Sequence, residues 1–150
     1  MQTATGRRRV PPTTRRRVRP AAFVAVAAGG ALGTATRDAL ATQFPVGIGA
    51  FPWTTFAINV SGSFALGLLL TFVLERWPPT RYVRPFLAIG LLGGYTTFST
   101  FSVEADLLFR RGHVAIGLTY VLGSLAAGAG AVYLGIVVGR GWPALRRSTR

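Results

Sequence analysis

Four long apolar stretches follow one another along the chain, separated by short segments rich in arginine, glycine or proline. They run at about 21–40, 53–74, 85–110 and 114–139. The second, Trp53 to Leu74, holds no charge in 22 residues, enough for a helix to cross a hydrocarbon core about 30 Å thick at about 1.5 Å per residue. The pattern therefore predicts an all-α membrane protein with four transmembrane helices.

The third stretch has an unusual middle. The Gly93-Gly94 pair favours a break, and five hydroxyl side chains fall between Thr96 and Ser102. In hydrocarbon, irregular backbone is tolerated only where protein buries it or where it lines a polar cavity. Phe98 and Phe101 are three apart, so a helix stacks their rings on one face. We interpret this stretch as a helix broken in mid-membrane that lines a permeation path; plain packing of the two rings is the alternative.

The net charge of +13 comes wholly from arginine. Residues 1–20 carry seven arginines and are predicted to form a disordered, basic cytoplasmic tail, with a second basic tail at 140–150 and the membrane domain at 21–139. A signal peptide is the alternative for the N-terminus, although no clear cleavage site follows the basic segment. Because the arginines lie at the ends and in the connections, a nucleic-acid partner is not expected.

Apart from arginine, the side chains that could bind a ligand are mostly uncharged hydrogen-bond donors. Four acidic residues, one histidine and no cysteine supply no catalytic set, so we expect no enzyme. Hydroxyl and amide groups donate hydrogen bonds, and a phenyl ring is electropositive at its edge, which suits a small anion. Tyr120 and Ser124 share a helix face. A buried asparagine often only bonds a neighbouring helix, so for Asn59 a structural and a functional role are both open.

Three motifs in order resemble those of the Fluc (also called CrcB) fluoride channels. Gly93–Glu104 (GGYTTFSTFSVE) matches the third-helix signature, and Gly29–Arg37 (GGALGTATR) and Asn59–Phe64 (NVSGSF) match the first and second helices. The resemblance covers about residues 21–139. It implies a dimer of two four-helix subunits in opposite membrane orientations, with two narrow pores in the cell membrane. Such a channel exports fluoride passively and protects the cell from fluoride toxicity.

The resemblance also implies roles for single residues. Phe98 and Phe101 would line the pores, and Asn59 would lie at the aqueous mouth and orient the rings. A polar track, a row of hydroxyl-bearing residues that faces the rings, would comprise Ser99, Thr100, Tyr120 and Ser124. One helical turn further, where some members of the family carry another serine, this chain has Gly128.

A structural sodium ion at the dimer centre is a further implication of the resemblance. It would be held by backbone carbonyls that correspond to Gly93 and Thr96. Arg37 and Glu104 match family positions with a structural or vestibular role.

The distribution of arginine predicts one fixed membrane orientation. With both termini cytoplasmic, 14 arginines lie on that side, in 1–20, 76–84 and 140–150, and three on the other, Arg37, Arg110 and Arg111. The positive-inside rule reads such a bias as a single topology. An antiparallel dimer would then need a paralogous second subunit fixed the other way, which we favour, although a homodimer is possible.

Two other functions fit parts of the sequence. A small proton-coupled exporter of cationic toxic compounds needs a titratable carboxylate facing its chamber, and Glu104 is the only candidate besides Asp38. A membrane anchor that presents arginine tails would explain the charge but leave the hydroxyl and phenyl groups unexplained.

Overall fold

The computed structural model describes residues 20–75 and 82–141, with the side chains of 73–75 left out. Segments 1–19, 76–81 and 142–150 fall outside this description, and with them almost all of the two predicted tails.

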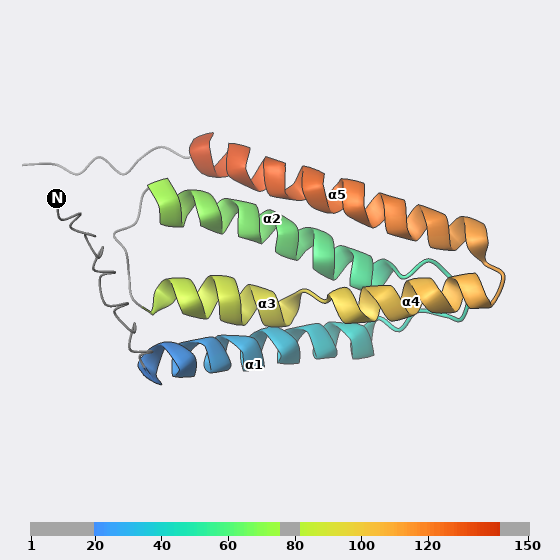
Figure 1. The fold of residues 1–150 in the computed structure, drawn as a ribbon, viewed down its shortest axis with the longest axis horizontal. Helices are drawn as coiled ribbons and strands as arrows, with labels where there is room; N and C mark the ends of the chain where they lie inside the picture. The colour runs from blue at the N-terminus through green and yellow to red at the C-terminus, as the bar shows by residue number, and fades with distance from the viewer. Residues whose placement is uncertain (1–19, 76–81, 142–150) are drawn as a thin grey trace, which may run out of the picture.

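Every element in the described ranges is helical. The elements are α1 (Pro20–Gln43), α2 (Trp53–Glu75), the π-helix η1 (Pro85–Leu91), α3 (Leu92–Tyr95), α4 (Phe98–Arg110) and α5 (Val114–Gly141). Because η1, α3 and α4 follow one line, the chain forms four rods, which lie side by side in the order α1, η1–α3–α4, α2 and α5 (Figure 1). The prediction of an all-α fold with four helices is confirmed.

Three of these rods are long and apolar enough to cross a membrane: Trp53–Phe72, Pro85–Arg110 and Val114–Gly141. The first rod, α1, has 24 residues but does not meet the same test of apolar character, because Arg37, Asp38 and several threonines and glycines dilute it. The sequence predicts its end near residue 40. Instead it continues to Gln43, and its Thr36 and Thr42 hydroxyls donate to the carbonyls of Leu32 and Asp38 within the helix.

Glycines allow the rods to touch backbone to backbone. On α1, a Cβ at Gly29 or Gly33 would strike the carbonyl oxygens of Phe86 or Leu91, and one at Gly94 would lie 2.5 Å from the Gly30 oxygen. Gly67 and Gly135 play the same part between α2 and α5. Small residues are what membrane helices use for such close approach, so glycine sets the spacing of both helix pairs.

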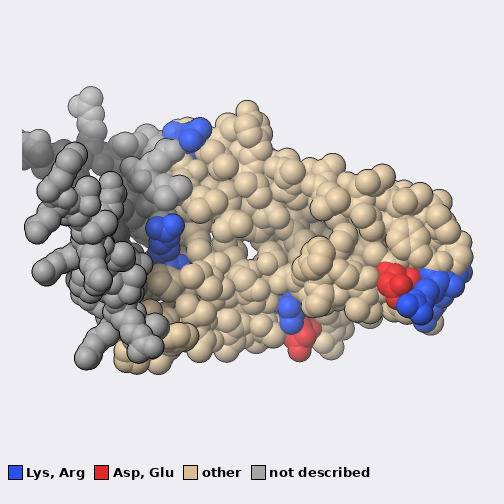
Figure 2. Space-filling model, in the orientation of Figure 1, with Lys and Arg blue, Asp and Glu red and all other residues tan. Residues whose placement is uncertain are grey.

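The two ends of the bundle differ in their connections. The start of α1, the end of α2, the start of η1 and the end of α5 lie together at one end, and the connections 44–52 and 111–113 lie at the other (Figure 1). On the face shown in Figure 2, charged side chains gather at these ends and at one point along an edge, and the middle of the described surface is uncharged.

Candidate permeation site

The third rod is interrupted after Tyr95. Thr96 has a ψ of 153° and Thr97 has φ −143° and ψ 121°, both extended, before α4 begins at Phe98. α3 runs through Gly93 and Gly94, so the expectation that the glycine pair breaks the helix is wrong. Neither glycine has a positive φ, and Gly94 is needed instead for its contact with Gly30.

Asn59 of α2 holds the interruption in place. Its Nδ2 donates to the Thr97 carbonyl at 3.0 Å, and its Oδ1 accepts from the Thr97 amide at 2.9 Å. The Thr97 hydroxyl caps α4 by accepting from the Thr100 amide at 3.1 Å, and donates to the Thr100 hydroxyl at 3.0 Å. A single side chain thus satisfies both backbone groups of Thr97, which is buried, and this replaces the lost helical hydrogen bonds.

The interruption deprives several carbonyl oxygens of their usual helical donors, and those of Gly93 and Thr96 are among them. In an α-helix the Gly93 carbonyl would accept from the amide of Thr97, but that amide donates to Asn59. The Thr96 carbonyl would accept from the amide of Thr100, which donates to the Thr97 hydroxyl. Gly93 is exposed, and a Cβ built on it meets nothing within 4 Å. The Gly93 and Thr96 carbonyls therefore lose their helical partners at the break.

The two phenyl rings follow the interruption directly. Phe98 and Phe101 have ring centroids 5.9 Å apart at an interplanar angle of 35°. Phe98 is 79% exposed, whereas Phe101 is half-buried and its ring lies 5.0 Å from that of Tyr120. The rings are neighbours, but only Phe101 belongs to the packed interior of the described chain.

A groove of about 450 Å³ runs along this region. Six of the predicted site residues line it, together with Thr97, Ser63 and Gly128. The predicted residues that line it are Asn59, Gly93, Thr96, Phe98, Phe101 and Ser124. The Ser124 hydroxyl is buried and has no hydrogen-bond partner among the described residues.

Ser99, Thr100 and Tyr120 do not line the groove. Ser99 and Thr100 are exposed and lie within hydrogen-bond distance of the Thr97 hydroxyl, in the first turn of α4. Tyr120 has no exposed surface, and its hydroxyl donates to Glu104 Oε2 at 2.7 Å.

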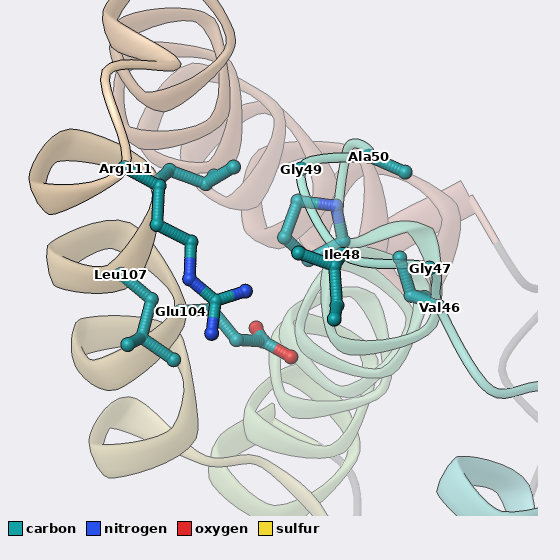
Figure 3. A pocket seen from close by; sticks show the side chains of 10 residues that line it. Val46, Gly47, Ile48, Gly49, Ala50, Glu104, Leu107 and Arg111 are labelled. Atoms are coloured by element: carbon teal, nitrogen blue, oxygen red, sulfur yellow. The ribbon is translucent and has the colours of Figure 1, made fainter.

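Glu104 forms the centre of a second polar cluster. Its Oε1 accepts from the Thr55 hydroxyl at 2.8 Å while Oε2 accepts from Tyr120. The carboxylate also lines a cavity of about 220 Å³ between α4 and the 46–50 segment, where Arg111 extends its guanidinium toward it (Figure 3). The predicted vestibular residue Glu104 therefore links α2, α4 and α5, whereas Arg37 is half-buried on α1 and lines neither space.

Sequence reasoning overlooked two of these residues. Thr97 carries a recognisable signal, because threonine directly before a helix is a favoured N-cap. Thr55 carries none, since its partner Glu104 is 49 positions away and only the fold brings them together.

Comparison with known proteins agrees with this arrangement. A family model described as CrcB-like protein, Camphor Resistance (CrcB), matches residues 24–136. The chain belongs to the CrcB family. The resemblance seen in the three motifs is thereby confirmed, and the matched segment includes most of each helical rod and every residue of the groove.

Relatives within the family carry a common description. The chain is 56% identical over 126 residues to the Fluoride-specific ion channel FluC 3 of Streptomyces avermitilis, covering 84% of this chain and 62% of that relative's length. It is 42% identical over 127 residues to FluC 2 of Nocardia farcinica, covering 85% and 87%. It is 44% identical over 119 residues to FluC of Solibacter usitatus, covering 79% and 98%. All three are named as ion channels, not as enzymes.

Proposed function

We propose that this chain is a subunit of a fluoride-specific ion channel that carries fluoride passively out of the cell and so limits fluoride toxicity. The observation that carries the proposal is the groove, which is lined by the phenyl pair Phe98 and Phe101, by Asn59, and by Ser124, whose hydroxyl has no partner among the described residues. Relatives named fluoride-specific ion channels align over most of the chain, which supports the same function.

The chemistry of the groove favours a small anion in transit. Phenyl edges and a hydroxyl offer weak positive potential from several directions, with no carboxylate among the residues that line it. Weak contacts at several points replace a hydration shell and still release the ion. Glu104, the carboxylate that an exporter would need, already accepts hydrogen bonds from Thr55 and Tyr120.

The working channel is an antiparallel dimer whose interruption at Thr96 and Thr97 lies in mid-membrane. Phe98 is 79% exposed and Gly93 has open space beside it, although each lines the groove. A second subunit would cover both residues and close the groove into a pore.

A sodium ion fits at the centre of this dimer. The freed carbonyls of Gly93 and Thr96 are hard oxygen ligands of the type that such a cation prefers. In a two-subunit assembly each chain would contribute them, and the ion would stabilise the two interruptions against each other.

Flux measurements in liposomes test the function. Vesicles that contain the protein, with its second subunit if one is required, should release fluoride when a potassium ionophore lets potassium leave with it and so prevents a membrane potential from building up. They should retain chloride. Chloride release at a similar rate would refute fluoride selectivity. Flux that requires a pH gradient would favour the proton-coupled exporter instead.

A further inference from the structure

Two of the helices that line the groove, α2 and α5, lie next to each other. α2 contributes Asn59 and Ser63, and α5 contributes Ser124 and Gly128, each pair four positions apart. Residues at this spacing lie on the same face of a helix. Each helix therefore offers two positions to the groove, one turn, or about 5.4 Å, apart.

The register of the two helices places Ser63 level with Gly128. Both helices run in the same direction (Figure 1), and contacts further along have a similar offset, with Gly67 against Val132 and Thr71 against Gly139. A Cβ built on Gly128 would lie 3.6 Å from Ser63 Oγ. The hydroxyl of Ser63 thus lies beside the one of these two α5 positions that has no side chain.

Ser63 also has a hydroxyl that is not otherwise engaged. No hydrogen bond involves it within the described part of the chain, although most hydroxyls in that part bond to a backbone carbonyl or another side chain. Ser61, two positions earlier, lies within 3.1 Å of the Ile58 carbonyl and 3.0 Å of the Tyr95 hydroxyl. Ser63 is half-buried on the groove wall, so its donor is available to an occupant of the groove.

We propose that Ser63 is a fluoride-binding residue that continues the row of donors beyond Ser124, from the neighbouring helix α2. On α5 the row ends at Ser124, because Gly128 offers no side chain. An ion that leaves Ser124 meets its next hydroxyl on α2, at the level of Gly128. This assignment rests on the proposed channel function and adds a binding position to it.

Removal of the hydroxyl tests the assignment. In fluoride-release measurements on vesicles, Ser63→Ala should lower the flux about tenfold, since a hydrogen bond to a charged partner is worth at least that factor. Ser63→Cys keeps the volume and substitutes a weak donor, so it should also lose flux. Ser61→Ala is the matched control on the same helix and should conduct at the wild-type rate. The melting temperature of each variant in detergent establishes that it is folded.

A compensating change separates binding from a structural role. Ser63→Ala combined with Gly128→Ser returns one hydroxyl to the same level of the groove from α5. The 3.6 Å contact at that position is an ordinary van der Waals distance and leaves room for the side chain. The double variant should regain most of the lost flux.

The outcomes distinguish this inference from the proposed function. If the wild-type protein releases no fluoride, the channel function itself fails. If the wild-type conducts and Ser63→Ala conducts equally well, Ser63 is not a binding residue. A folded Ser63→Ala variant whose flux is low and is not restored by Gly128→Ser would also overturn the proposal.

Discussion

Asn59 is the residue on which the local geometry of the site depends. Its amide oxygen and nitrogen are both used by the backbone of Thr97. The sequence left structural and functional roles open, and the structure places the side chain in a bracing position that also lines the groove. Asn59 can therefore stabilise the interruption and line the groove at the same time.

Replacement of Asn59 by aspartate should harm both stability and flux. Asn59→Asp keeps an acceptor for the Thr97 amide but sets a carboxylate oxygen against the Thr97 carbonyl, in place of a donor at 3.0 Å. We expect a loss of about 1–3 kcal/mol in stability and reduced fluoride flux. Thermal melting in detergent and vesicle flux measure the two effects, with Ser102→Ala, whose hydroxyl bonds its own helix at the Phe98 carbonyl, as control. Unchanged melting would contradict the bracing role.

The two phenylalanines should respond differently to the same change. Isoleucine keeps apolar bulk but lacks an electropositive edge, so Phe98→Ile and Phe101→Ile should each cut fluoride flux, on the order of tenfold. Only Phe101→Ile should also lower the stability of the subunit, by about 0.5–1.5 kcal/mol, because its ring packs on Tyr120. Wild-type flux in both variants would identify the rings as packing alone.

Among the elements, the pair of α1 with η1–α3 depends on glycine. The three glycines of α1, Gly29, Gly30 and Gly33, are not equivalent. A Cβ on Gly33 would strike the Leu91 backbone, whereas one on Gly30 would come no nearer than 4.0 Å to the Gly90 oxygen. Only the structure distinguishes the glycine that is required from its neighbour.

This difference predicts opposite results for one substitution at two positions. Gly33→Ala should destabilise the subunit by about 1–3 kcal/mol through overpacking against backbone that cannot yield. Gly30→Ala should be neutral or slightly stabilising, because alanine is the better helix former by about 1 kcal/mol. Melting curves of the two variants provide the comparison. Equal losses would show that the glycine contact does not set the spacing of these helices.

Features set by local sequence could be predicted, whereas features set by contacts between distant residues could not. The bounds of α2, expected at 53–74 and found at Trp53–Glu75, were predictable because hydropathy is a local property. The position of the interruption was not, because Thr97 is held by Asn59, 38 residues away. Six groove residues were predicted from sequence, five of them through the motifs, whereas the Thr55 contact with Glu104 arises only from packing.

For the whole molecule, the uneven charge has a consequence for orientation. The four helix ends that lead to the arginine-rich segments lie together (Figure 1), so the 14 arginines attach to one end of the bundle. We expect that end to face the cytoplasm in every copy. The partner in an antiparallel dimer would then be a separately encoded subunit.

Single cysteines test this orientation, because the chain has none of its own. Ile48, 84% exposed in the 44–52 connection, and Tyr82, 47% exposed beside the opposite end, are suitable sites. In intact cells an impermeant thiol reagent should label Ile48→Cys and leave Tyr82→Cys unlabelled. Partial labelling at both, together with fluoride flux from this chain purified alone, would indicate a homodimer that inserts both ways.

The hold of Asn59 on Thr97 also bears on the order of synthesis. A ribosome delivers α2 to the bilayer before the third rod, so Asn59 is already present when Thr96 and Thr97 leave the translocon. Peptide groups without partners are costly in hydrocarbon, and here the partner for those of Thr97 precedes them in the chain. The nascent protein thus makes Asn59, the partner of the irregular segment, before the irregular segment itself.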